Sequence, residues 1–329
     1  MPENQFRPNS RARDLAITQH LSREGRKVDK IGFIGLGNMG AHMARRLCEA
    51  GYAPAVFDVD ASRRAAFEAI GASWADSPQA MADQASIIVV SLPTPAVVEE
   101  VLTGAQGLIH GKAVKFIVDT STTGPEVSKR AAERLAGRAI QLVDAPVSGG
   151  TSGAADGSLS IMVSGAPQAY ETVSGILRVI GRNLFYLGEE PGQGQLMKVI
   201  NNTICAAATL ASFEGLVLGS RAGIDARVML DIINVSSGRN FSTEVKIPQC
   251  VVERNFPLRF TTTLLHKDVK LCLDEAARQG VPMWVSDAAR QMLQFAISQG
   301  DGPVDYGNVI KRYEAWAGTQ FGGEPQPQH

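Results

Sequence analysis

The sequence predicts an α/β domain with a mostly parallel, doubly wound sheet, followed by an all-α domain that a long interdomain helix joins to it. Between residues 30 and 188, short runs of β-branched residues alternate with helical patterns, which is typical of a parallel sheet covered on both faces. After Gly192 the strand pattern disappears. Residues 195–223 instead predict one long helix, apolar nearly all round and therefore buried between packed elements.

The elements are expected in a regular order along the chain. Strands are expected at 30–37, 53–60, 85–93, 115–122, 139–146, 158–165 and 184–188, and helices between the earlier strands at 41–51, 61–72 and 125–137. Four helices follow the long one, at 225–237, 263–280, 284–300 and 306–318. We therefore expect a first domain over 29–191, a second over 192–320, and a disordered tail over 321–329.

Composition excludes several classes of protein. The chain of 329 residues has a formal net charge of −1 and no long basic run, which argues against nucleic acid as a partner. No uninterrupted apolar stretch suggests a membrane helix. The four cysteines and five histidines are scattered, so we expect neither disulfides nor a metal, and a reducing, cytoplasmic location. Residues 1–28 lack the apolar core of a secretory signal and predict a disordered extension or an extra helix, with a transit segment as the weaker alternative.

A glycine-rich turn after the first strand predicts a dinucleotide site. Gly35, Gly37 and Gly40 have G-x-G-x-x-G spacing between a strand and a helix, and Asp58 ends the second strand about 20 residues later. A turn without ligand is the alternative. Asp58 should accept from ribose hydroxyls, which favours NAD, with NADP possible beside the Arg63–Arg64 pair. The other expected cofactor contacts are Leu36, Asn38, Met39, Leu92, Pro93, Thr94, Val97 and Thr122.

A second glycine-rich segment, "DAPVSGGTSGAADGSLSIMVSG" at 144–165, suits an anion. Ser148, Gly149 and Gly150 follow a strand end and present backbone N–H groups with little side-chain cover. A carboxylate is the most plausible ligand, so we expect a small carboxylate-bearing substrate. The alternative is a connector that only turns the chain.

A lysine stands on the long helix where a buried face is expected. Leu196, Val199, Ile200 and Ile204 predict that face, yet "GQGQLMKVINNT" carries Lys198, and Asn202 stands one turn later. Both side chains can then contact the same small molecule. A snorkelling surface lysine is the alternative.

At this point the chain resembles the β-hydroxyacid dehydrogenase family. Four motifs over roughly residues 30–318 carry the resemblance: "GFIGLGNMGAHMARRL", the 144–165 segment, "GQGQLMKVINN" and "HKDVKLCLDEA". The resemblance implies a Rossmann domain and an α-helical domain with the site between them. It also implies hydride transfer between NAD(P) and a short hydroxy acid, and a homodimer or homotetramer.

Matching the motifs position by position implies roles for single residues. Lys198 corresponds to the catalytic lysine and Asn202 to the asparagine that holds lysine and substrate. The resemblance also implies a substrate-binding hydroxyl at Ser121, a carboxylate cradle at Gly149–Gly150, and at Lys267, beside Asp268, a residue that closes over the cofactor. Thr151 and Ser152 make the cradle more polar than usual, and the 236–246 segment lacks the aromatic residues of valine-pathway enzymes. Within that segment Asn240 and Phe241 either line the substrate pocket or belong to a surface loop.

The expected chemistry uses lysine as the general acid and base. Oxidation of an alcohol needs a hydride acceptor and a base for the hydroxyl proton, and no histidine lies in the segment that carries Lys198 and Asn202. Burial and the positive nicotinamide would lower the pKa of Lys198 and allow it to act as that base. Two alternatives remain: an imine reductase, which usually has another residue at this position, and a non-catalytic dinucleotide-binding module.

Overall fold

The first domain is built on a parallel sheet of six strands. The computed structural model describes residues 30–322. The sheet has the order β3-β2-β1-β4-β5-β6, and every neighbouring pair is parallel. The strands are β1 (Ile31–Ile34), β2 (Ala55–Phe57), β3 (Ser73–Trp74), β4 (Ile87–Val90), β5 (Phe116–Asp119) and β6 (Gln141–Asp144). This arrangement confirms the predicted doubly wound sheet.

Both faces of the sheet are buried, which explains the continuous apolar strands. Successive β1 residues point to opposite faces, so Phe33 belongs to one core cluster and Ile34 to the other. The covering helices are α2 (Gly40–Glu49), η1 (Ala61–Arg63), α3 (Arg64–Glu68), α4 (Pro78–Ala82), α5 (Pro95–Thr103), η2 (Leu108–His110), α6 (Pro125–Ala136), α7 (Gly150–Asp156) and α8 (Pro167–Ile180).

The last three strands form a separate small sheet rather than continuing the parallel one. They are β7 (Val147–Ser148), β8 (Ser160–Val163) and β9 (Asn183–Tyr186). β7 pairs antiparallel with β8, and β8 pairs parallel with β9. A single antiparallel bridge between Asp144 and Ser164 ties this sheet to β6. The chain therefore turns back at 144–147, directly before the glycine-rich segment.

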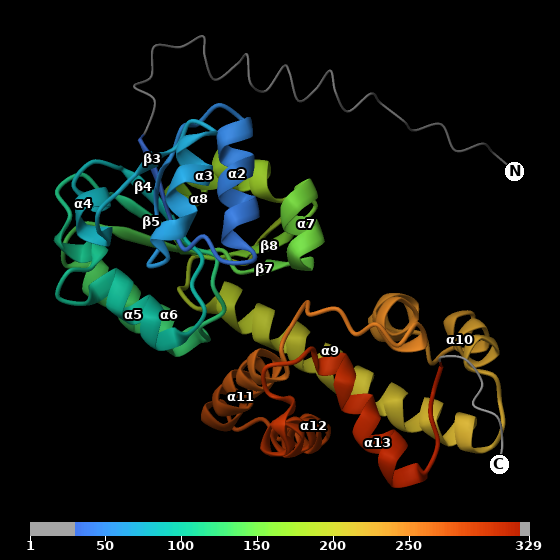
Figure 1. Ribbon diagram of the computed structural model, residues 1–329. Helices are drawn as coiled ribbons and strands as arrows, with labels where there is room; N and C mark the ends of the chain where they lie inside the picture. Colours follow the sequence, from blue (N-terminus) through green and yellow to red (C-terminus); the bar gives the residue numbers. More distant parts are fainter. Residues whose placement is uncertain (1–29, 323–329) are drawn as a thin grey trace, which may run out of the picture.

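The second domain is helical, as predicted, and is organised around α9 (Gln193–Arg221). Figure 1 shows α9 starting beneath the sheet domain and running through the helical domain. The remaining elements are α10 (Ala226–Asn234), η3 (Ser242–Val252), α11 (Thr262–Arg278), α12 (Trp284–Ala296), η4 (Ile297–Asp301), η5 (Tyr306–Val309) and α13 (Ile310–Ala317). The π-helix η3 was not expected from the sequence, because Pro248 within it argues against a regular helix.

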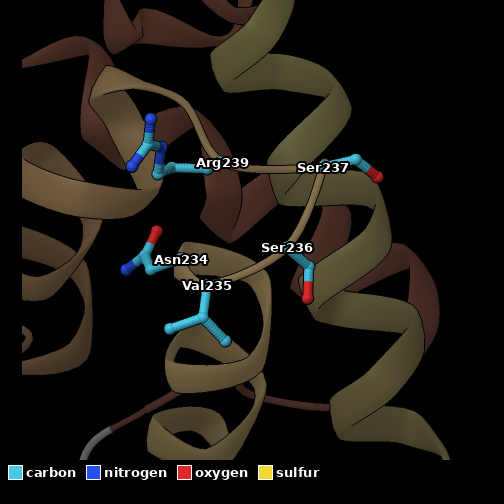
Figure 2. A pocket seen from close by; sticks show the side chains of 5 residues that line it. All are labelled: Asn234, Val235, Ser236, Ser237 and Arg239. Atoms are coloured by element: carbon cyan, nitrogen blue, oxygen red, sulfur yellow. The ribbon is translucent and has the colours of Figure 1, made fainter.

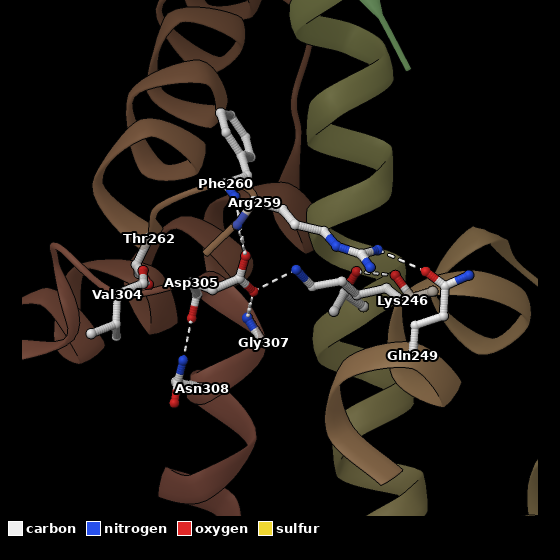
Figure 3. A network of polar contacts seen from close by, with 11 residues as sticks. Lys246, Gln249, Arg259, Phe260, Thr262, Val304, Asp305, Gly307 and Asn308 are labelled. Atoms are coloured by element: carbon white, nitrogen blue, oxygen red, sulfur yellow. Dashed lines mark hydrogen bonds and ion pairs between the residues drawn. The ribbon is translucent and has the colours of Figure 1, made fainter. Parts of the chain in front are cut away.

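A buried ion pair holds η3 in place (Figure 3). Lys246 of η3 pairs with Asp305, and the two side chains are 4% and 0% exposed. Asp305 also accepts backbone N–H bonds from Arg259 and Phe260, both 3.0 Å long, and from Gly307 at 2.9 Å. This one carboxylate therefore joins three segments of the helical domain.

One face of α9 is exposed, which corrects the prediction of a fully buried helix. Val199 is buried, but Ile204, expected on the same buried face, is 63% exposed. By length and composition alone α9 is apolar enough to cross a membrane, although the sequence suggested no such segment. Its other face packs against α11 and α13 and contributes Phe213 and Leu216 to the domain core. These contacts are those of a core helix.

The ordered chain also extends into the predicted tail. Phe321 is fully buried, and its backbone N–H donates to Glu314 at 2.9 Å while its carbonyl accepts from Arg254 at 3.2 Å. The predicted tail boundary at 321 is therefore wrong by at least this residue. The predictions for residues 1–28 and 323–329 lie outside the described residues.

Candidate active site

The strand order reverses between β1 and β4, whose carboxyl ends lie side by side. Gly35 follows β1 and Leu92 follows β4, the two strands between which the order changes direction. A Cβ at Gly35 would collide with the carbonyl of Ser91, and one at Gly40 with the carbonyl of Gly35. A Cβ at Gly37 would meet nothing within 4 Å, so its backbone is open to a ligand. The first turn of α2 carries no acidic residue, which suits a pyrophosphate.

Asp58 braces the glycine turn. Its carboxylate accepts from the backbone N–H of Leu36 at 2.5 Å and from that of Asp60 at 2.8 Å. The Leu36 side chain itself is fully buried. Arg63 and Arg64 form exposed ion pairs with Asp60 and Glu68, respectively, as expected for a solvated helix face. The residues of the turn thus fit a dinucleotide.

The ends of β4 and β5 are joined through Ser121. Its hydroxyl oxygen accepts from the backbone N–H of Leu92 at 2.9 Å, and its own N–H donates to Asp119 at 2.9 Å. Burial raises the pKa of Asp119 to about 6, against the lowering effect of its hydrogen bonds from Ser121. Nearby, Thr94 caps α5 by accepting from the N–H of Val97 at 3.3 Å. Pro93, the next expected cofactor contact, is exposed.

Lys198 is buried without a fixed partner. The residue is 8% exposed, and its side-chain amine forms no hydrogen bond or ion pair with any residue that the structure describes. Burial lowers the pKa of its amine, while the carboxylate of Asp268 acts in the opposite direction and the charge of Lys267 lowers it further. The amine is therefore suited to exchange a proton with a bound molecule.

Asp268 connects the polar residues around this lysine. It accepts from the Asn202 side-chain amide at 2.7 Å and lies 3.0 Å from the Lys267 amine. Lys267 also donates to the carbonyl of Thr122 at 2.6 Å, which joins α11 to the first domain. Asn202 accepts from Asn201 at 3.1 Å rather than binding Lys198 directly. The sequence named Asp268 only as a neighbour of Lys267, because tertiary contacts decide its role.

The first turn of α9 is anchored on the sheet domain. The backbone N–H of Gly192 donates to Asp144, and that of Gly194 to the hydroxyl of Ser164 at 2.9 Å. A Cβ at Gly194 would collide with the carbonyl of Met162, so the helix lies directly on β8. Burial raises the pKa of Asp144, against hydrogen bonds that include the one from Gly192. An acid ending an apolar strand was the only sequence signal for this anchor.

The proposed anion cradle has open backbone. Ser148 ends β7, and α7 begins at Gly150. Gly149 and Gly150 have φ angles of 134° and 66°, which favour glycine. A Cβ at Gly150 would meet nothing within 4 Å. At the cofactor turn, Asn38 is exposed while Met39 packs partly against the core.

Two of the expected substrate residues lie far from the lysine within one chain. Asn240 donates to the hydroxyl of Ser212 at 3.1 Å. Ser212 follows Lys198 by fourteen residues on α9, which is about 21 Å along a helix. Phe241 is 58% exposed. A hollow of about 400 Å³ lies next to this segment. Figure 2 shows the side chains that line it, Asn234, Val235, Ser236, Ser237 and Arg239.

Comparison with known proteins identifies the family of this chain. Residues 30–188 match the family described as the NAD binding domain of 6-phosphogluconate dehydrogenase, and residues 192–313 match that described as the NAD-binding domain of NADP-dependent 3-hydroxyisobutyrate dehydrogenase. The chain is 37% identical over 300 residues to 2-(hydroxymethyl)glutarate dehydrogenase of Eubacterium barkeri, covering 90% of this chain and 99% of that protein. The chain belongs to the β-hydroxyacid dehydrogenase family.

Other β-hydroxyacid dehydrogenases show the same relationship. NAD-dependent L-serine dehydrogenase of Pseudomonas aeruginosa is 33% identical over 298 residues, covering 88% of this chain and all of that protein. The crystal structure of 3-hydroxyisobutyrate dehydrogenase from Salmonella typhimurium has a TM-score of 0.77 at 28% identity, covering 86% of this chain and 99% of that one. An imine reductase from Myxococcus stipitatus, 17% identical with a TM-score of 0.59, shares only the fold. The chain is thus an NAD(P)-dependent oxidoreductase of hydroxy acids, as predicted.

Proposed function

We propose that this enzyme transfers hydride between NAD(P) and a small 3-hydroxy acid or its semialdehyde, with Lys198 as the general acid and base. The observation that carries the proposal is a buried lysine with no fixed partner and a lowered pKa, within a polar network at the sheet's carboxyl edge. Three substrates named among the relatives, 2-(hydroxymethyl)glutarate, 3-hydroxyisobutyrate and L-serine, all carry a hydroxyl on the carbon β to a carboxylate. That shared unit supports the substrate class.

The chain's residues divide the work of this reaction. A bound nicotinamide supplies the hydride acceptor. The neutral Lys198 amine accepts the hydroxyl proton as the C–H bond breaks and the carbonyl forms, and the ammonium returns the proton in reduction. Asn202, held by Asp268, faces the substrate one turn further along α9. The open N–H groups at Gly149–Gly150 and the Ser121 hydroxyl orient the carboxylate.

The test is an absorbance assay of NAD⁺ reduction over a panel of hydroxy acids. We expect turnover of acids whose hydroxyl lies β to the carboxylate, and much less with 2-hydroxy acids of equal size. Reduction of cyclic imines without oxidation of any hydroxy acid would favour the imine reductase alternative. Dinucleotide binding without turnover of any substrate would favour the non-catalytic module.

We also propose that Asp58 makes the enzyme prefer NAD over NADP. Its carboxylate lies at the end of β2 beside the glycine turn, where a 2′-phosphate would be repelled. Asp58→Asn should lower the ratio of kcat/KM for NAD to that for NADP, while Asp231→Asn, at an exposed residue of α10, leaves the ratio unchanged. An Asp58→Asn enzyme with an unaltered ratio would remove this assignment.

We further propose a homodimer in which the exposed face of α9 packs on its own copy. Met197, Ile204 and Leu218 are 37%, 63% and 71% exposed, and the exposed Ala211 completes a line with a spacing of seven residues. The line is symmetric about its midpoint at 207–208. An antiparallel, two-fold pair would therefore place Met197 against Leu218 and Ile204 against Ala211.

Such a pair would bring the displaced substrate residues to the lysine. Symmetry about 207–208 places the level of Ser212 in one subunit beside residues 202–203 of the other. The partner's Asn240, bound to the partner's Ser212, would then lie about 8 Å along the helix from Lys198, instead of about 21 Å within one chain. Lys198 and Ser212 each follow a residue of this exposed line by one position. In a two-fold antiparallel pair, these positions of both helices face the same side. We therefore still expect Asn240 and Phe241 to line a substrate pocket, but the pocket of the partner subunit.

Mixing two inactive variants tests this arrangement. Lys198→Met and Phe241→Ala subunits should each be poorly active alone, but a mixture should regain activity, because one site of each hybrid has both residues intact. No recovery after verified exchange would place the two residues outside a shared site. Ile204→Glu should yield monomers by light scattering, whereas Phe185→Glu, at a 54% exposed residue of β9, should not.

The four free cysteines support our proposal of a reducing, cytoplasmic location.

A further inference from the structure

A fully buried amide lies one turn before the lysine. Gln195 is in the first turn of α9 and is 0% exposed. Lys198 follows three residues later, so both side chains lie on one side of the helix. A buried glutamine is costly unless both ends of its amide are hydrogen-bonded.

Both ends of this amide bind the same loop of the other domain. The Gln195 nitrogen donates to the carbonyl of Ser121 at 3.1 Å, and its oxygen accepts from the backbone N–H of Thr123 at 2.9 Å. Ser121 and Thr123 are 5% and 1% exposed, so water does not replace these bonds readily. Lys267 of α11 binds the carbonyl of the intervening Thr122 at 2.6 Å. The loop that carries the Ser121 hydroxyl is thus held from two helices.

We propose that Gln195 is a positioning residue that sets the separation between the Ser121 hydroxyl and the Lys198 amine. The inference rests on the proposed function, because it assigns these two groups to the substrate's carboxylate and hydroxyl. An amide is suited to this place because it offers one donor and one acceptor side by side. A carboxylate would present an oxygen to the Ser121 carbonyl and push the loop away. A displacement of about 1 Å can lower a rate by about 10²-fold.

Two substitutions of similar size separate the hydrogen bonds from packing. Gln195→Met removes both bonds, and kcat/KM for the hydroxy acid should fall by about 10²-fold, mostly in kcat. The kcat/KM of Gln195→Glu should fall by a similar factor at neutral pH. When protonated, its carboxyl again offers a donor and an acceptor, so its activity should recover toward the wild type as pH is lowered. Gln193→Glu, at an exposed residue two positions earlier, adds the same charge and should leave kcat/KM within about twofold.

The pH comparison is made against Gln193→Glu at each pH. The titratable groups around this amide are Asp119 and Asp144 from the sheet, Lys198 from α9 and Lys267 from α11. These groups are present in every variant, so the activity ratio removes the part of their titration that the variants share. A ratio that rises as pH falls for Gln195→Glu, but stays flat for Gln195→Met, supports the inference. Equal losses in both variants at every pH, or near-normal activity of Gln195→Glu, would overturn it.

Amide hydrogen exchange tests the clamp without substrate. In Gln195→Met the Thr123 N–H loses its acceptor and should exchange at least tenfold faster than in the wild type, while amides in the middle of β5 keep their rates. Unchanged exchange at Thr123 would refute the clamp. A wild-type enzyme that oxidises no hydroxy acid would instead refute the proposed function, and the exchange rate would still decide whether the clamp exists.

Discussion

Two buried lysines of the helical domain have opposite surroundings. Lys198 on α9 is 8% exposed and Lys246 on η3 is 4% exposed. Lys246 pairs with Asp305 and lies 4.3 Å from the centre of the Tyr306 ring. The Lys198 amine has no ion pair or hydrogen bond among the described residues, and Asp268 acts on it only through its charge.

The difference shows how burial can serve structure or chemistry. An ion-paired lysine joins the segments around its partner, at the cost of removing two charges from water. An unpaired lysine loses part of its affinity for the proton, and burial then makes it reactive. The contact that is missing at Lys198 is therefore the one that a substrate hydroxyl can supply.

The largest expected effect is on turnover, which should depend on Lys198 but not on Lys246. Lys198→Met should lower turnover by about 10³-fold, because the substrate loses its general base. NAD affinity should stay unchanged, since the glycine turn is untouched. Lys246→Met is the matched control and should retain the turnover of the folded enzyme. Steady-state rates corrected for folded fraction check both, and normal turnover of Lys198→Met would remove that residue from the mechanism.

The converse effect is on stability. Lys246→Met should lower the free energy of unfolding by about 3–5 kcal/mol, because Asp305 is left buried and uncompensated. Denaturant unfolding measures this. Adding Asp305→Asn should recover part of the loss, since an amide oxygen can still accept the N–H bonds of Arg259 and Phe260. A loss below 1 kcal/mol in the single variant would show that the pair does not hold η3.

A smaller effect should appear in the pH dependence of oxidation. The reaction needs a neutral amine, so kcat/KM for oxidation should rise with pH through the lowered pKa of Lys198. Asp268 raises this pKa, so Asp268→Asn should move the rise to lower pH. The substituted amide can still accept from Asn202. A rise that stays in place, or moves to higher pH, would contradict the assignment.

The smallest effect is the stability change at Lys198 itself. Its pKa is lower in the folded chain than the ordinary value of 10.5, so the unfolded chain binds more protons between the two pKa values. Burial of this lysine therefore lowers the free energy of unfolding most below the folded pKa. This cost disappears as pH rises toward 10.5. Lys198→Met should stabilise the protein most at low pH and progressively less at higher pH. Unfolding curves across pH measure the trend.

Much of the fold could be predicted because its elements carry local signals. The glycine turn, the apolar strands and the long helix all have characteristic periodicities. The two-residue β3 is too short for a pattern, and the glycine-rich 144–165 segment hides α7. Helix α5 has a Thr94 cap and Pro95 at its start, a signal that could have been used.

The site was harder to predict because its geometry is tertiary. Lys198 and Asn202 stand four apart on one helix, so local sequence relates them. Gln195 contacts a loop more than seventy residues earlier, and no periodicity reveals that distance. Hydrophobicity also could not distinguish a buried apolar residue from an exposed one, which is why Ile204 was expected inside.

The long helix α9 has a consequence for how this chain tolerates change. One helix of 29 residues carries both Lys198 and the line of exposed residues that includes Ile204. One inserted residue between Lys198 and Ile204 would rotate everything beyond it by about 100°. Lys198 would keep its position next to the sheet domain, because the first turn of α9 is anchored there. The exposed residues from Ile204 onward would point in a different direction. Length variation in homologues should therefore collect at the helix ends.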